Sequence, residues 1–155
     1  MMKITGAMGS AYTMTEEEVD RFLESKLNLQ LATLDEMGDP NIQPIWFEYD
    51  KDKKKLFIMT PKASKKAQNI RRKPNVYFSI DDENFPYKGV KGKGEAIILE
   101  DKKEIMLLVE RINMKYLGTL EHPIAKMLID NARNGIETAF EITPKFFSTW
   151  DFGKA

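Results

Sequence analysis

Four polar side chains gather where a predicted strand runs into a predicted helix: Thr60 ends the strand, and Ser64, Lys65 and Lys66 open the helix. Segment 61–73 contains no Asp or Glu. A helix N-terminus is the positive end of the backbone dipole, so lysines there are unfavourable unless an anion lies among them. The spacing therefore predicts a phosphate-binding site, although a solvated lysine pair beside a loop remains an alternative.

The other cations of this segment, Arg71, Arg72 and Lys73, fall at the C-terminal end of the same predicted helix. The dipole favours positive charge there, so we interpret them as a solvated helix end and assign them no ligand. The whole chain is electrically balanced, with 24 Lys and Arg against 24 Asp and Glu. Because the basic patch is small and the total charge is neutral, we expect no nucleic-acid partner.

Several other kinds of site are excluded or disfavoured by composition. The chain has no cysteine, which removes disulfides, thiolate nucleophiles and cysteine-based metal sites. Its single histidine, His122, precedes Pro123 in a predicted turn, and we interpret it as a surface residue. The carboxylates do not cluster at metal-ligand spacing, so we predict no metal site. No apolar run is long enough to span a bilayer, and we expect a cytoplasmic protein with no membrane partner.

The predicted elements place the basic segment between short strands. A capping box at Thr15 and Glu18 predicts a helix over about 16–26. Alternating or apolar runs predict five strands up to the middle of the chain, at 29–34, 42–50, 56–60, 76–81 and about 90–100. Pro44 should lie at a sheet edge or bulge, and the glycines at 92 and 94 suggest a bulge or a close backbone approach.

Two further helices, at about 101–116 and 123–134, and a last strand at 137–143 complete the pattern. Most strand connections are too short for parallel crossovers, which favours an antiparallel barrel. We divide the chain into a mobile leader, residues 1–14, which is small, glycine-containing and aperiodic, and a single domain, residues 15–155.

The segment LFIMTPKASKKAQNIRRKPNV (56–76) resembles the flavin-phosphate segment of the pyridoxamine 5'-phosphate oxidase-like, FMN-binding split-barrel proteins. The likeness continues through GKGEA (92–96) and PKFFSTWDF (144–152) and covers most of the chain from Thr15 onward. It implies a mainly β, α+β fold: a six-stranded antiparallel split β-barrel with peripheral helices. It also implies a homodimer that binds FMN at its interface.

The resemblance further implies which residues bind the cofactor. Ser64, Lys65 and Lys66 would hold the FMN phosphate, assisted by Thr60. Residues of the second strand would border the ribityl chain and ring, Met59 would lie near the ring, and Trp150 would come from the partner subunit unless it packs a terminal strand onto its own barrel. The implied cofactor-binding residues are Gln43, Pro44, Ile45, Trp46, Met59, Thr60, Ser64, Lys65, Lys66 and Trp150.

One departure from the family limits the implied activity. Pyridoxamine phosphate oxidases continue beyond the C-terminal tryptophan with an Arg-x-His-x-Arg type segment that grips the substrate phosphate, whereas five residues follow Trp150 here. We therefore expect a flavoprotein that is not a true pyridoxamine phosphate oxidase, and more specifically an FMN-dependent oxidoreductase acting on a small molecule. An F420-dependent reductase and a non-catalytic flavin-binding module remain alternatives, with a small nucleic-acid-binding barrel as a remote third. No catalytic side chain can be named.

Overall fold

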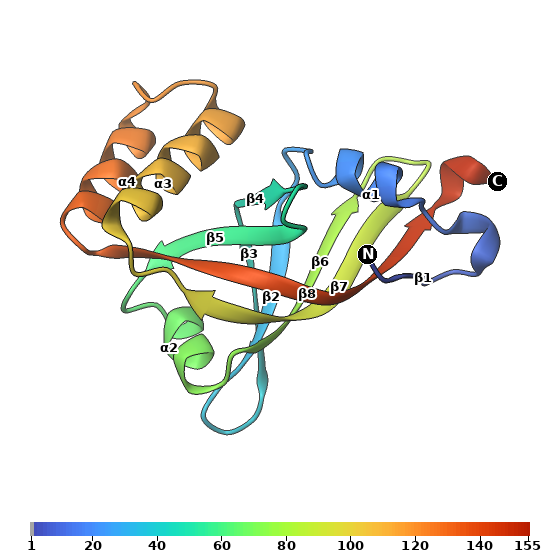
Figure 1. The fold of residues 1–155 in the computed structure, drawn as a ribbon, viewed down its shortest axis with the longest axis horizontal. Coiled ribbons are helices and arrows are strands. Elements are labelled where there is room, and N and C mark those ends of the chain that lie inside the picture. Colours follow the sequence, from blue (N-terminus) through green and yellow to red (C-terminus); the bar gives the residue numbers. More distant parts are fainter. Residues whose placement is uncertain (1) are drawn as a thin grey trace.

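The computed structural model describes residues 2–155 and forms a curled, almost entirely antiparallel sheet (Figure 1). Seven strands follow the order β3-β2-β6-β7-β8-β5-β4, and short β1 pairs in parallel with β8. The strands are β1 (Ile4–Gly6), β2 (Leu29–Leu34), β3 (Pro40–Ile45), β4 (Phe47–Asp50), β5 (Lys55–Pro61), β6 (Asn75–Asp82), β7 (Lys88–Ile98) and β8 (Glu137–Asp151). The prediction of a mainly β split barrel is confirmed.

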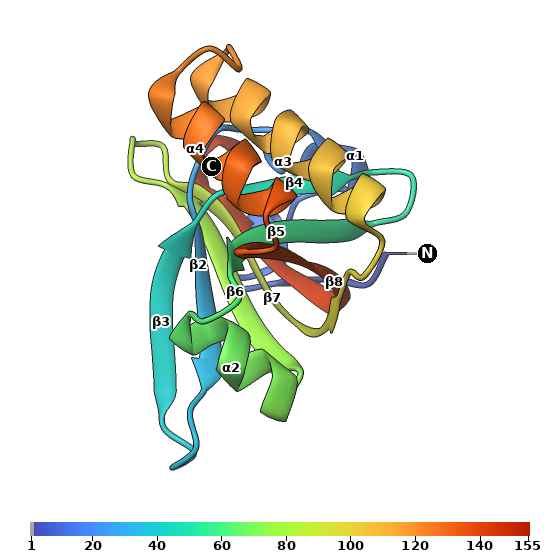
Figure 2. The same ribbon diagram turned by 90° about the vertical axis from the view of Figure 1, so that its left-hand side faces the viewer.

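Four α-helices lie around the sheet: α1 (Glu16–Phe22), α2 (Lys65–Arg72), α3 (Lys102–Leu117) and α4 (Pro123–Arg133). Helices α3 and α4 pack side by side, and Figure 2 shows this pair and α2 flanking the same end of the sheet from opposite sides. Their ends follow local signals, since Thr15 and Asp101 accept capping hydrogen bonds and Gly118 ends α3 with a φ of 73°.

The predicted strand count was too low, because the expected strand 42–50 is two strands. The chain leaves β3 at Ile45 and enters β4 at Phe47, so Trp46 stands between them. Strand β3 pairs with β2, whereas β4 pairs with β5 at the other end of the sheet order. The apolar sequence continues through this corner without a turn residue, which is why its pattern indicated one strand. Pro44 lies in edge strand β3, as expected.

Part of the expected leader has regular structure. Ile4–Gly6 forms β1, and the backbone N–H of buried Met14 donates to Thr149 Oγ1 at 3.0 Å. These contacts supply the strand that the sequence reading left out. The mobility of residues 1–14 stays a prediction about their dynamics.

Two apolar clusters hold the fold together. The larger fills the inside of the curled sheet and includes Leu31, Phe47 and Ile58. The smaller joins β5 and β8 to helices α3 and α4, through residues such as Phe57 and Ile112. Because strand neighbours point to opposite faces, β5 contributes to both clusters and is buried on both sides. The helix pair is therefore packed firmly on the strand that leads to α2.

The glycines of β7 permit a close approach between β7 and β8. A Cβ at Gly92 would lie 2.4 Å from the Phe146 carbonyl oxygen, and one at Gly94 would lie 2.6 Å from that of Thr143. The β7–β8 register shifts between Lys93 and Gly94, which confirms the predicted bulge. None of the described helices is both long enough and apolar enough to cross a membrane.

Lys115 connects α3 to the corner between the strands. Its Nζ donates to the Phe47 carbonyl oxygen at 2.9 Å and lies 3.8 Å from the centre of the Phe47 ring. Burial lowers the pKa of Lys115 to about 8, and the charges of Glu48 and Glu24 oppose this shift. The folded state therefore holds this proton less tightly than the unfolded chain does.

This difference predicts a pH-dependent contribution to stability. Below about pH 8 Lys115 is charged in both states, and between there and its ordinary pKa of 10.5 the unfolded chain binds more protons, so stability rises with pH. We expect the unfolding free energy of the natural protein, relative to Lys115→Met, to increase by at least about 1 kcal/mol between about pH 7 and pH 10. Denaturant titrations of both proteins would refute this if the difference were independent of pH.

Candidate functional site

The start of α2 is held against the sheet by its own polar side chains. Ser64 is the N-cap, and its Oγ accepts from the Ala67 N–H at 3.2 Å. The Ser64 hydroxyl also lies 3.0 Å from buried Thr60 Oγ1. One turn later, buried Asn69 donates to Thr33 Oγ1 on β2 at 3.0 Å. These bonds fix the first turn of the helix beside the end of β5, as the sequence predicted.

Within residues 2–155, the first turn of α2 has backbone donors without a hydrogen-bond partner. With Ser64 at the N-cap and the Ala67 N–H bonded to it, the N–H groups of Lys65 and Lys66 have no intrahelical acceptor. The first turn of α2 contains no acidic residue. The N-terminus of α2 can therefore offer two backbone donors and the positive end of the helix dipole to an anion.

Lys66 is the unusual charge of the site because it is buried. Only 8% of the residue is exposed, and its Nζ donates to Gln43 Oε1 on β3 at 3.2 Å. Burial lowers the pKa of Lys66, partly offset by the charge of Glu137. An ammonium carries three donors, and this is its one hydrogen bond within residues 2–155. The Lys66 ammonium therefore has donors to offer a ligand.

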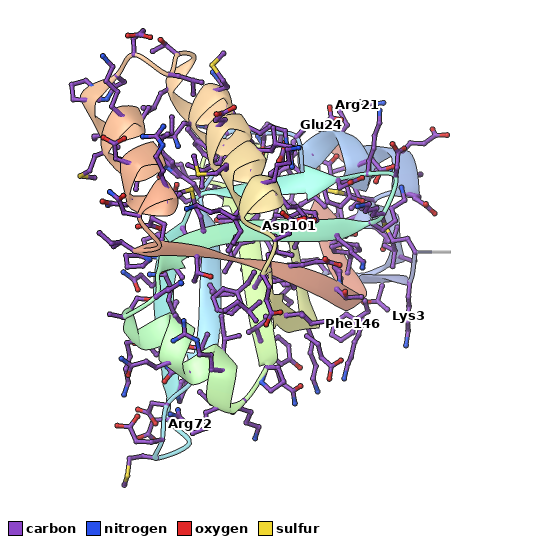
Figure 3. The ribbon with its side chains drawn as sticks, turned by 60° about the vertical axis from the view of Figure 1, so that its left-hand side comes forward. Lys3, Arg21, Glu24, Arg72, Asp101 and Phe146 are labelled. Carbon is purple, nitrogen blue, oxygen red and sulfur yellow. The ribbon has the colours of Figure 1, made fainter. Side chains whose placement is uncertain are left out.

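Lys65 and Arg72 have partners from another part of the fold. Lys65 Nζ lies 2.5 Å from Glu36 Oε2, in the turn of the β2–β3 hairpin. Arg72 donates to the Leu34 carbonyl oxygen at 3.1 Å, and Figure 3 shows it near the tip of that hairpin. Segment 61–73 contains no acidic residue of its own, but the β2–β3 hairpin places Glu36 beside it. Lys65 is therefore compensated within the chain, while Lys66 faces inward.

Lys66 opens onto a cavity of about 520 Å³ between β3, β5, α2 and α4. Six of the residues predicted from the sequence line it, namely Pro44, Ile45, Trp46, Met59, Thr60 and Lys66. Two more predicted residues are hydrogen-bonded to members of this group: Gln43 to Lys66, and Ser64 to Thr60. The fold thus brings together eight of the ten predicted residues, although they come from separate segments of the chain.

The sequence reading missed the rest of the cavity wall. The additional lining residues are Asn28, Pro61, Met127, Leu128, Asn131 and Glu137. Helix α4 supplies three of them, and its amphipathic spacing had indicated only a packed helix. Nothing local in the sequence signalled that α4 reaches the C-terminal end of β5. This contact depends on how the helix pair docks on β5 and β8.

An aromatic surface stands at one side of the cavity. The Trp46 ring stacks on Tyr116 with centroids 4.8 Å apart and planes 4° apart. Tyr116 is fixed in turn, because its hydroxyl donates to the Leu27 carbonyl oxygen at 2.7 Å and accepts from the Phe47 N–H at 3.3 Å. Trp46 is therefore held in one orientation beside the cavity, with Met59 as a second apolar neighbour.

Trp150 lies elsewhere in the chain. It is near the end of β8, paired with Gly89, and a Cβ at Gly89 would lie 2.2 Å from the indole. It does not line the cavity beside Lys66. Packing of the indole on its own barrel is thus observed, and its contribution to a partner's cofactor site stays a prediction.

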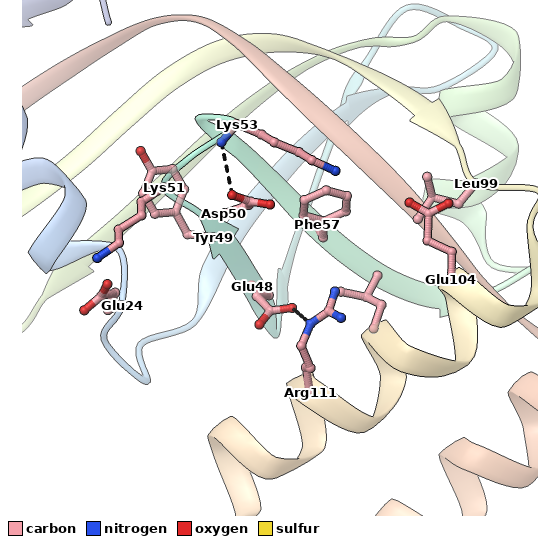
Figure 4. A pocket seen from close by; sticks show the side chains of 11 residues that line it. Glu24, Glu48, Tyr49, Asp50, Lys51, Lys53, Phe57, Leu99, Glu104 and Arg111 are labelled. Atoms are coloured by element: carbon pink, nitrogen blue, oxygen red, sulfur yellow. Dashed lines mark hydrogen bonds and ion pairs between the residues drawn. The ribbon is translucent and has the colours of Figure 1, made fainter.

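A second cavity lies between the β4–β5 hairpin and α3 (Figure 4). One ion pair crosses it, in which Arg111 Nε lies 2.7 Å from Glu48 Oε2, and Asp50 accepts from the Lys53 backbone N–H at 3.0 Å. The cavity contains none of the residues that the sequence predicted for the cofactor, and we assign it no ligand. Among residues 2–155, no group of three or more His, Cys, Asp or Glu could hold a metal ion.

The cavity beside Lys66 combines features that suit one kind of ligand. Free donors on a helix end and a buried ammonium suit an anionic tail, and a held aromatic ring with apolar neighbours suits a planar group. A phosphorylated aromatic cofactor has both parts. The residues present therefore fit a flavin phosphate, and they include no evident general acid or base except Glu137.

Comparison with known proteins gives a family match over most of the chain. The family model described as Pyridoxamine 5'-phosphate oxidase matches residues 15–151. No curated protein matches the chain.

Solved structures share the fold over most of the chain. The conserved hypothetical protein Rv2991 from Mycobacterium tuberculosis is 25% identical, with a TM-score of 0.81 over 94% of this chain and 90% of that one. A protein named F420 Reductase is 27% identical, with a TM-score of 0.68 over 83% and 94%. HutZ, the heme storage protein from Vibrio cholerae, is 17% identical, with a TM-score of 0.67 over 88% and 93%, and shows the fold alone.

The capping role of Ser64 can be tested without any ligand. Ser64→Ala removes the acceptor of the Ala67 N–H and should lower the unfolding free energy by about 1 kcal/mol. Ser79→Ala, on partly exposed β6 and without a side-chain hydrogen bond in the described chain, should change it by less than about 0.5 kcal/mol. Equal effects in denaturant unfolding would show that Ser64 does not hold the first turn.

Proposed function

The chain belongs to the pyridoxamine 5'-phosphate oxidase family, and we propose that it is an FMN-binding flavoprotein whose cofactor phosphate lies at the first turn of α2. The observation that carries this proposal is the buried ammonium of Lys66, which faces a cavity with only Gln43 as hydrogen-bond partner within residues 2–155. A buried charge is costly unless it is compensated. Glu137 acts on the ammonium through its charge without a direct ion pair, and a phosphate would supply the direct contact.

Each part of the site has a separate task in binding. The Lys66 ammonium and the backbone N–H groups of the α2 first turn would hold phosphate oxygens, while Thr60 and Ser64 keep that turn in place. Trp46, steadied by Tyr116, and Met59 would border the ring and exclude water from it. Lys65, paired with Glu36, would add a weaker and more exposed positive charge.

The family fold also guides the proposed activity. When bound, a flavin supplies hydride and electron transfer, and the protein contributes position and electrostatics. We therefore infer an oxidoreductase that acts on a small molecule admitted beside Trp46. Cavity residues on α4, notably Asn131, would contact that molecule, because they lie across the cavity from the strand end.

We further propose that the protein acts as a cytoplasmic homodimer with FMN at the interface. Trp150 of one subunit would complete the site of the other, as the family resemblance implies. The exposed side chain of Met127 on α4, which lines the cavity, supports a partner surface there, since a large apolar side chain gains from being covered.

Two other functions use the same site. The likeness to a protein named F420 Reductase favours the deazaflavin F420 as the alternative cofactor. The absorbance spectrum and mass of the bound molecule, released by denaturation, distinguish the two. A non-catalytic flavin-binding module would bind flavin but show no turnover with NAD(P)H and any acceptor.

The proposal assigns phosphate binding to Lys66 at the start of α2 and not to the cations at its C-terminal end, and this difference can be tested directly. Lys66→Ala removes a charge-assisted hydrogen bond and should raise the Kd for FMN roughly 10- to 100-fold. Arg72→Ala, which loses bonds to the hairpin, and Lys73→Ala, which removes one exposed cation, should stay within about threefold. Flavin fluorescence titration measures all three, and circular dichroism confirms that each variant is folded.

An equal loss of affinity in the three variants would mean that the basic segment acts only through its total charge. An unchanged Kd in Lys66→Ala would remove Lys66 from the site. Either result contradicts the proposed binding mode.

A further inference from the structure

A second buried charge faces the same cavity, and no assigned role explains it. Glu137 is the first residue of β8, opposite Pro61 at the end of β5, and only 4% of it is exposed. It lines the cavity together with Lys66. Within residues 2–155 its carboxylate has no hydrogen bond, and Lys66 is the one charge near enough to affect it. A buried carboxylate without a donor is costly unless it becomes neutral.

The charge balance at this point changes when a phosphate arrives. Before binding, one buried ammonium and one buried carboxylate compensate each other without a direct ion pair. A phosphate monoester brings about −1.5 to −2 charges and takes the ammonium as its own partner. Glu137 would then lie beside an anion in a site of low polarity. Taking up a proton is the least costly way to relieve that repulsion.

We propose that Glu137 is a further residue of the cofactor site and that it takes up one proton when a phosphate-bearing flavin binds at Lys66. This inference rests on the proposed function, because it needs the phosphate to lie near Lys66. It makes the affinity for FMN fall as pH rises. The protonated carboxyl also gains an O–H donor toward the cavity.

The surroundings of Glu137 support a proton-exchanging role. Burial raises the pKa of its carboxyl, and the Lys66 charge opposes that shift. Glu137 also lines a neighbouring cavity of about 490 Å³. The charged groups of that cavity are Lys62, Glu100, Lys102 and Arg133, from the β5–α2 connection, the β7–α3 connection, the start of α3 and the end of α4. Through this second cavity a proton can reach Glu137 while a ligand fills the first.

The test counts protons during binding. Isothermal titration of FMN in several buffers of different ionisation enthalpy gives the number of protons taken up, for the natural protein and for Glu137→Gln. The natural protein should take up as much as one proton more than the variant, and its Kd should rise up to about tenfold per pH unit relative to the variant. The variant titration removes the contribution of the FMN phosphate itself.

Riboflavin is the matched control ligand, and its binding is compared with that of FMN on the natural protein. It lacks the phosphate, leaves Lys66 beside Glu137, and should bind without proton uptake. Equal proton uptake with FMN and riboflavin, or with both proteins, would overturn the role of Glu137. FMN binding that weakens in Glu137→Gln without any change in proton count would instead make Glu137 an ionised acceptor, which also overturns it. Failure of FMN to bind the natural protein at every pH would overturn the proposed function itself.

Discussion

The arrangement of this protein depends on one constraint, the burial of the Lys66 ammonium at the first turn of α2. A lysine at that position opposes the helix dipole and loses hydration, and Gln43 returns one hydrogen bond to it. The fold tolerates this because Ser64 caps the helix and Asn69 bonds it to β2. Such a costly placement is typical of a site that completes its charge balance with a ligand.

The sheet topology explains how distant segments reach that lysine. Strand β5 is buried on both faces, so the inner core and the α3–α4 pair hold its end in place. The corner at Trp46 carries the chain from β3 to β4 and leaves the indole stacked on Tyr116. The helix pair then closes the opposite wall with side chains of α4. The barrel thus provides a rigid support, and the cavity forms where strand ends and helices meet.

Local features of the sequence predicted local features of the structure. The caps at Thr15 and Ser64 and the bulge near Gly94 each depend on a few neighbouring residues, and the structure has all of them. The strand break at Trp46 was missed because apolar residues continue through it. Glu36 and Glu137 were missed for another reason: each is distant in sequence from the lysine it affects, so only the pairing of strands reveals it. The candidate site was therefore predicted as a basic cluster, and its acids were not.

The most direct measurement of this account is a crystal structure of the protein with FMN bound. We expect the phosphate to lie within hydrogen-bond distance of Lys66 Nζ and of the α2 first-turn N–H groups, with the ring beside Trp46. A phosphate bound at another surface, with Lys66 still bonded only to Gln43, would contradict the account.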